Sequence, residues 1–264
     1  MSPTDTRPLA VITGASTGIG LGIARALAAE GHDLVVAADE PAIHEAATEL
    51  GGGEAHVQPV EADLATREGV VALADAARAG GRPVDVLVLN AGVGVSGPFV
   101  ETAVEDHLRL LELNVVGAVH LAGLLLPGMV ARGSGRLLVV SSIAAAMTGP
   151  QMSTYNASKT FLAAWGEAIA EEVDDRGVSV TILKPGGTDT AFFARADMED
   201  TRLGRAKKDD ADEVGREAVE ALLAGRREIV SGGAKNKVME TASKVLPDSV
   251  VGPAHERFVE KPDT

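Results

Sequence analysis

The sequence has no cysteine, one tyrosine and one tryptophan, and aromatic residues make up only 3% of its 264 positions. The lack of cysteine excludes disulfides and thiolate chemistry. It also means that the cysteine content gives no evidence about the cellular compartment. Because aromatics are few, the core must be built mainly from Ala, Val, Leu and Ile. The 45% hydrophobic content supplies these in quantity, which is ample for a large domain.

Basic residues are also scarce: 24 Lys and Arg stand against 38 Asp and Glu, a formal net charge of −14. Phosphates would be repelled by this charge, which disfavours a nucleic-acid partner. Neither a membrane span of roughly 18 uninterrupted apolar residues nor a signal-peptide stretch is expected in the sequence. We therefore expect a cytoplasmic protein without a membrane partner, and the scattered histidines predict no metal site.

Short β-branched apolar runs alternate with longer alanine-rich periodic stretches along the chain. The runs are continuously apolar, so both faces of the sheet should be covered by helices. Strand, helix and strand in this order predict a single α/β domain over residues 1–264, a doubly wound parallel sheet of about seven strands with helices on both faces. The predicted strands are Leu9–Thr13, Asp33–Ala38, His56–Val60, Asp85–Asn90, Arg136–Ser142, Ser179–Lys184 and Glu228–Ser231. The predicted helices are Ile19–Glu30, Ile43–Leu50, Arg67–Arg78, Val104–Ala131, Tyr155–Asp174 and Asp212–Ala224.

Two segments interrupt this alternation. Residues 187–207 lie in a long connection of mixed charge, and a connection of that length in a compact domain is usually functional. We expect it to be a lid over a substrate. Residues 234–264 form a C-terminal extension with the basic amphipathic stretch KNKVMETASKVL, which is expected to pack on its own domain in preference to a membrane or a partner.

The stretch TGASTGIG, Thr13–Gly20, follows the first strand and opens the first helix. Its glycines allow a tight turn and a close ligand approach, and the helix N-terminus offers free N–H groups to a pyrophosphate. An ordinary βα turn is the alternative, but the position after the first strand favours dinucleotide binding. A Walker loop is excluded because no Lys-Ser/Thr pair follows the last glycine. The candidate cofactor contacts are Gly14, Ser16, Thr17, Gly18, Ile19 and Gly20.

Asp39 ends the second strand, about 20 residues after the glycine turn. A carboxylate there can accept hydrogen bonds from the ribose hydroxyls and would repel a 2′-phosphate. Thr17 and Glu40 add no positive charge. The predicted cofactor is NAD, preferred over NADP.

Several further motifs follow in order between residue 9 and about residue 231. Asp63-Leu64 follows the third strand, Asn90-Ala91-Gly92 follows the fourth, and Pro185 to Thr190 reads PGxxxT. With TGxxxGxG and the YxxxK of Tyr155 to Lys159, these motifs resemble the classical short-chain dehydrogenase/reductase family. The resemblance implies a Rossmann-type fold and hydride transfer between a nicotinamide cofactor and a secondary alcohol or ketone. It assigns further cofactor contacts to Asp63, Leu64, Asn90, Ala91, Gly92, Tyr155, Lys159, Pro185, Gly186, Thr188 and Thr190.

Four residues are the candidate catalytic group: Asn114, Ser142, Tyr155 and Lys159. Tyr155 and Lys159 share one helix face, and Ser142 lies thirteen residues before Tyr155, the interval that the family uses. A nearby ammonium and the positive nicotinamide ring would lower the phenol pKa, so Tyr155 is the expected general acid/base. The resemblance implies that Ser142 binds the substrate oxygen, Lys159 the nicotinamide ribose, and Asn114 a relay water.

Candidate substrate-wall residues are mostly apolar and indicate an alcohol or ketone with a hydrophobic body. They are Val93, Val95, Ala144, Met147, Met152, Phe192 and Phe193. An NAD-linked alcohol dehydrogenase, a ketone reductase and a catalytically idle NAD-binding sensor or scaffold remain open, although retention of the catalytic residues counts against the sensor. The resemblance also implies a homotetramer or homodimer formed through Val104–Ala131 and Tyr155–Asp174.

Overall fold

A computed structural model describes residues 7–245 and 248–260. Its seven strands form one parallel sheet in the order β3-β2-β1-β4-β5-β6-β7. This confirms the predicted doubly wound, Rossmann-type sheet, with strand boundaries displaced by at most two residues. The strands are β1 Leu9–Thr13, β2 Asp33–Ala38, β3 Val57–Glu61, β4 Val84–Leu89, β5 Gly135–Val140, β6 Val178–Lys184 and β7 Glu228–Val230.

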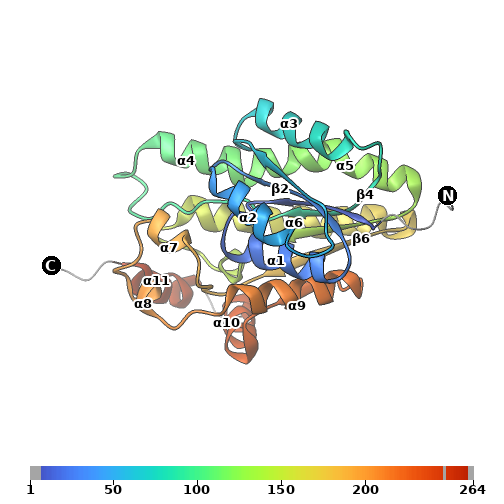
Figure 1. The fold of residues 1–264 in the computed structure, drawn as a ribbon. Helices are drawn as coiled ribbons and strands as arrows, with labels where there is room; N and C mark the ends of the chain where they lie inside the picture. Colours follow the sequence, from blue (N-terminus) through green and yellow to red (C-terminus); the bar gives the residue numbers. More distant parts are fainter. Residues whose placement is uncertain (1–6, 246–247, 261–264) are drawn as a thin grey trace.

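Helices cover both faces of the sheet, as the continuous apolar strands require. One face packs against α3 (Arg67–Arg78), α5 (Ala118–Arg132) and α6 (Ser153–Val173), and its core side chains are mostly Val, Leu and Ala. The other face packs against α1 (Gly18–Ala29), α2 (Ala42–Leu50) and α9 (Ala211–Leu223). Figure 1 shows α3 and α5 on one side of the strands and α1 and α9 on the other. The core is aliphatic on both faces.

The strand order reverses between β1 and β4, which are neighbours in the sheet. Chain connections leave these two strands in opposite directions, so a crevice opens beyond their carboxyl ends. The glycine turn after β1 and the Asn90-Ala91-Gly92 segment after β4 both lie at this crevice. The topology therefore brings together motifs that are about 75 residues apart in the sequence.

The predicted helix Val104–Ala131 is not uniform. It consists of α4 (Val104–Leu111), a π-helical turn η1 (Glu112–Gly117) and α5. The π turn contains Asn114, whose side chain is fully buried, and π turns commonly mark functional positions in helices. By length and composition the run Val104–Arg132 could cross a membrane, but Leu121, Leu125 and Met129 on its α5 part are packed into the sheet core.

Both irregular segments contain helices. The predicted lid, residues 187–207, contains α7 (Phe192–Arg195) and α8 (Arg202–Arg205). The C-terminal extension forms α10 (Gly233–Val245) and α11 (Asp248–Val259), while residues 246–247 and 261–264 of that extension lie outside the described residues. Two short 3-10 turns, η2 (Ile143–Ala146) and η3 (Asp174–Arg176), complete the described elements.

Candidate active site

The glycine turn has the conformation that its sequence predicts. Gly14 and Gly18 have φ of +65° and +59°, which disfavour residues with a side chain. A Cβ on Gly18 would lie 2.7 Å from the Thr190 side chain, so the turn and the PGxxxT loop are in close contact. A Cβ at Gly14 would lie 2.9 Å from the Ala91 backbone. The backbone thus forms a cradle that fits a pyrophosphate above the start of α1.

Thr13 and Asn90 join β1 and β4 beneath this cradle. The Thr13 hydroxyl accepts hydrogen bonds from the N–H groups of Asn90 and Ala91, at 2.9 and 3.0 Å, and donates to the Val88 carbonyl at 3.1 Å. The Asn90 amide in turn donates to the carbonyls of Thr13 and Gly14, at 2.9 and 3.0 Å. Asn90 is thus a support for the turn, as well as one of the residues lining the cavity.

Carboxylates mark the ends of β2 and β3. Arg109 on α4 donates through Nη1 to Asp63 Oδ2 at 2.6 Å, and its Nη2 lies 3.5 Å from Asp39 Oδ2. The guanidinium holds the pKa of Asp63 below its usual value. Asp39 and Asp63 are therefore joined through one cation at the expected adenosine end of the crevice, a contact that the sequence did not predict.

Glu40 connects the glycine turn to the lid. It accepts a hydrogen bond from the Ser16 hydroxyl at 2.6 Å, and Arg195 of α7 donates to both of its carboxylate oxygens at 2.8 and 3.0 Å. The Ser16 and Arg195 donors lower the pKa of Glu40. The lid is thereby held over the crevice by an ion pair.

Tyr155 lies in the first turn of α6 beside Ser142, which caps η2. Burial raises the pKa of the phenol to about 12, and a hydrogen bond with the Ser142 hydroxyl opposes that rise. The Lys159 ammonium lies 5.9 Å from the centre of the Tyr155 ring and donates to the Val140 carbonyl at 3.0 Å. Burial lowers the pKa of Lys159 to about 8. The pKa of the phenol therefore lies above its ordinary value in the protein alone, and the positive nicotinamide ring is a further charge expected to lower it.

Asn114 holds the loop after β4 against α6. Its Oδ1 accepts from the Val93 N–H at 2.8 Å, and its Nδ2 donates to the Val93 carbonyl at 3.0 Å and to the Ser158 hydroxyl at 3.1 Å. A Cβ on Gly92 would lie 3.0 Å from Asn114 Oδ1 and 3.4 Å from Lys159 Nζ. The Asn114 amide therefore positions groups around Lys159, and the relay water stays a prediction.

One cavity of about 730 Å³ joins these groups. It is lined by the glycine turn, Asp39, Leu64, the segment after β4, Ser142, Tyr155, Lys159 and the PGxxxT loop, together with six of the seven predicted substrate-wall residues. Those six are Val93, Ala144, Met147, Met152, Phe192 and Phe193. Gly20, Asp63 and Val95 are not among the lining residues. The ring centres of Tyr155 and Phe192 lie 5.2 Å apart, which places the lid aromatics beside the reacting phenol.

Residues of the C-terminal helices α10 and α11 also line the cavity. Val251, His255 and Val259 are spaced four residues apart, so they share the face of α11 that lines it, and Met239 of α10 joins them. The sequence assigned no role to these positions. The apolar spacing on an amphipathic helix was the available signal, but the sequence could not show that this face covers the site.

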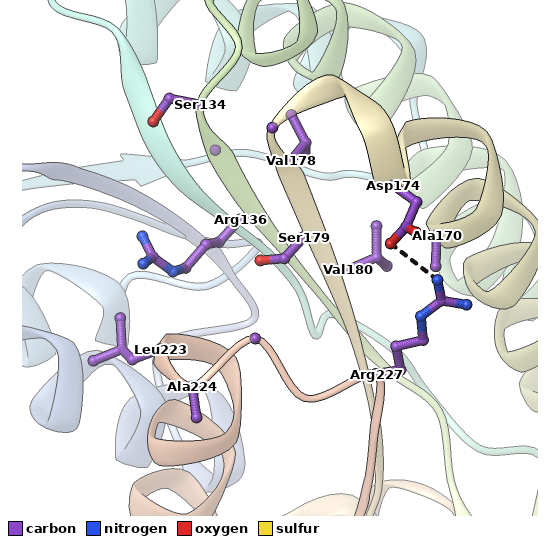
Figure 2. A pocket seen from close by; sticks show the side chains of 13 residues that line it. Ser134, Arg136, Ala170, Asp174, Val178, Ser179, Val180, Leu223, Ala224 and Arg227 are labelled. Atoms are coloured by element: carbon purple, nitrogen blue, oxygen red, sulfur yellow. Dashed lines mark hydrogen bonds and ion pairs between the residues drawn. The ribbon is translucent and has the colours of Figure 1, made fainter.

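A second cavity of about 400 Å³ lies at the opposite end of the strands (Figure 2). It is bordered by Arg136, Ser179 and the ion pair of Arg227 with Asp174, at 2.9 Å. None of the predicted site residues lines it. Within residues 7–245 and 248–260, no group of three or more His, Asp or Glu side chains is placed to hold a metal.

Comparison with known proteins decides the family. A family model described as short chain dehydrogenase matches residues 8–200. The chain belongs to the short-chain dehydrogenase/reductase family. It is 33% identical over 215 residues to the oxidoreductase UcpA of Salmonella typhimurium, covering 81% of this chain and 79% of UcpA. It is also 34% identical over 195 residues, 72% of this chain, to the glycine betaine reductase ATRR of Emericella nidulans, of which it spans only 15%.

Solved structures show the same fold. A short-chain dehydrogenase/reductase from Burkholderia phymatum in complex with NAD superposes with a TM-score of 0.82, 25% identity and complete coverage of both chains. The L-sorbose reductase of Gluconobacter frateurii, complexed with NADPH and L-sorbose, has a TM-score of 0.78 and 30% identity, covering 88% of this chain and 97% of that chain. The protein is therefore an NAD(P)-dependent oxidoreductase, and these two neighbouring structures contain NAD and NADPH respectively.

Proposed function

We propose that this protein is an NAD-linked oxidoreductase that interconverts a secondary alcohol and a ketone, with Tyr155 as the general acid/base. One observation carries the proposal. The phenol of Tyr155 is hydrogen-bonded to Ser142, has Lys159 beside it, and opens into the same cavity as the glycine cradle. A nicotinamide cofactor supplies a hydride acceptor or donor when it is bound there.

The residues of the chain handle the oxygen and its proton. In the oxidative direction Tyr155 takes the proton of the alcohol hydroxyl, while Ser142 hydrogen-bonds the same oxygen and fixes its position. In the reductive direction Tyr155 returns that proton to the carbonyl oxygen. Lys159 places a positive charge near the phenolate and so stabilises it. The aromatic lid, Phe192 and Phe193, excludes water from the reacting atoms.

Asp39 supports a preference for NAD over NADP. Its carboxylate lines the cavity beyond β2, where ribose hydroxyls are expected to bind and where a 2′-phosphate would meet negative charge. Glu40 adds a second carboxylate next to it. Fluorescence titration of the protein with NADH and with NADPH tests this preference. Tighter binding of NADPH than of NADH would contradict it.

The cavity wall favours an apolar substrate body. Met147, Met152 and the lid aromatics are joined there by Val251 and Val259 of α11. Arg195 of the lid lines the cavity but is paired with Glu40, and Arg202 is not among the lining residues. We therefore favour neutral secondary alcohols and ketones over hydroxy acids.

The proposal is tested with a panel of such alcohols and ketones, following the absorbance of NADH in both directions. Wild-type protein should turn over at least one pair, and Tyr155→Phe should lose about 10²–10⁴-fold of the rate while binding NADH with unchanged affinity. Near wild-type turnover by Tyr155→Phe would remove the general acid/base. A faster ketone reaction under cellular cofactor ratios would favour the reductase, and binding without any turnover would favour the sensor.

A homo-oligomer formed through the long helices is a further part of the proposal. Val104 and Leu108 of α4, Val116 of η1 and Phe161 of α6 are apolar and about half exposed, and exposed apolar surface of this kind favours association. Size-exclusion chromatography with light scattering tests it: Leu108→Glu should dissociate the oligomer. A monomeric wild type would contradict it. The cytoplasmic location also stays a prediction.

A further inference from the structure

Arg109 lies at the adenosine end of the crevice, although it comes from α4 and not from any of the predicted cofactor motifs. It joins the carboxylates after β2 and β3, at 2.6 Å from Asp63 and 3.5 Å from Asp39. These two strands are adjacent in the sheet. The guanidinium therefore stands over the place where the adenosine ribose and the carboxylate of Asp39 are expected to meet.

The ion pairs of Arg109 contribute too little to the stability of the fold to account for this arrangement. The side chains of Arg109, Asp63 and Asp39 are 42%, 38% and 53% exposed. Ion pairs at such exposure contribute only ~0–1 kcal/mol to folding, whereas the buried aliphatic clusters on both faces of the sheet provide the main stabilisation. What Arg109 does change is the local charge next to the cofactor cavity.

The carboxylates near Asp39 are each paired with an arginine. Glu40, the next residue, is paired with Arg195 of the lid, and Asp63 is paired most closely with Arg109. Without Arg109, the ends of β2 and β3 would present two carboxylates and no adjacent cation from α4. A 2′-phosphate carries up to two further negative charges, whereas a 2′-hydroxyl carries none. The charge of Arg109 should therefore affect the binding of NADP more than the binding of NAD.

We propose that Arg109 is a cofactor-specificity residue that limits the discrimination of Asp39 against the 2′-phosphate. Its guanidinium offers N–H donors and a positive charge to that phosphate, and it holds Asp39 in place for the ribose hydroxyls of NAD. The inference rests on the cofactor site of the proposed function. It implies that NADP is bound more weakly than NAD, but still measurably.

The test is direct titration of NADH and NADPH binding by cofactor fluorescence, which requires no substrate. Loss of one positive charge beside that phosphate, at an effective dielectric constant between those of protein and water, corresponds to a change in Kd on the order of tenfold. Arg109→Gln should therefore raise the Kd of NADPH about tenfold and that of NADH no more than about threefold. Asp39→Asn should shift the ratio in the opposite direction, in favour of NADPH.

Two further variants separate charge from geometry. Arg109→Lys keeps the charge and should retain most of the NADPH affinity. Arg216→Gln removes an arginine with exposed ion pairs to Glu213 and Glu220 on α9 and should change neither Kd. The effect of Arg109→Gln should also shrink as salt is added, because exposed charges are screened.

The measured cofactor affinities test the role of Arg109 without requiring any catalytic turnover. Unchanged affinities in Arg109→Gln, or equal changes for both cofactors, would overturn the inference, and so would a wild type that binds neither. If the shift in the NADH/NADPH ratio is observed while no alcohol or ketone is turned over, the inference stands and the proposed reaction fails.

Discussion

Replacing Lys159 by methionine should make the protein more stable while abolishing its activity. The ammonium is buried, and burial lowers its pKa from 10.5 to about 8. At about 1.4 kcal/mol per pKa unit, that difference corresponds to ~3 kcal/mol of destabilisation at pH 7. The lost hydrogen bond to the Val140 carbonyl offsets about 1 kcal/mol of the gain. A net increase of ~2 kcal/mol should raise Tm by roughly 4–8 °C.

The pH dependence identifies the cause. Below about pH 8 the ammonium is charged in both the folded and the unfolded state, so the full penalty of burial is present. As the pH rises from about 8 to 10.5 the folded protein loses the proton first, and the penalty declines to nearly zero. The stability difference between Lys159→Met and wild type should therefore be largest at pH 7 and shrink across this window.

Urea unfolding of both proteins at pH 7 and at about pH 10 measures this difference. Lys237→Met, at an exposed position of α10, is the matched control and should change stability little at either pH. If Lys159→Met is less stable than wild type at pH 7, or if its advantage is constant with pH, the ammonium is not an uncompensated charge and the reasoning is refuted. The predicted combination of higher stability and lost turnover is typical of residues retained for activity.

Three other substitutions test the arrangement of the site. Thr13→Val removes a buried hydroxyl and leaves the N–H of Asn90 without its partner, so the free energy of unfolding should fall by ~1–3 kcal/mol in urea titration; an unchanged value would contradict the role of this contact. Gly94→Ala would place a Cβ 2.5 Å from the Phe192 ring and should raise KM for apolar substrates several-fold while NADH affinity, measured by fluorescence, stays constant. Asn114→Ala should lower kcat at least about tenfold with little change in NADH affinity, and a selective loss of cofactor binding would assign it to the cofactor site instead.

Much of the fold was predictable because the sheet is buried on both sides. The strands β1, β2, β4, β5 and β6 are short runs of mostly buried residues, and the helices between them have regular spacing, so local pattern and tertiary environment agree. The edge strands β3 and β7 are more exposed. The glycine turn was predictable for a different reason. Positive φ at Gly14 and Gly18 restricts the residue type, and that restriction is visible in the sequence.

Other features depended on contacts between distant segments. The π turn contains Asn114, and the hydrogen bonds of Asn114 to Val93 and Ser158 join segments that no helical periodicity connects. The cavity face of α11 could be recognised only once its position over the site was known. Arg109 resembled any charged residue on a helix surface, because its contacts with Asp39 and Asp63 depend on where β2 and β3 end in space.

The most direct test of the central claim uses the fact that Tyr155 is the only tyrosine in the chain. Ultraviolet difference absorbance therefore reports the ionisation of this phenol alone, in the free protein and in its complex with NAD⁺. Burial raises its pKa to about 12 in the protein by itself, so we expect no ionisation there below about pH 11. In the complex, the positive nicotinamide ring should lower the titration midpoint by ~2 pH units or more. The same midpoint in both states would contradict the assignment of Tyr155 as the general acid/base.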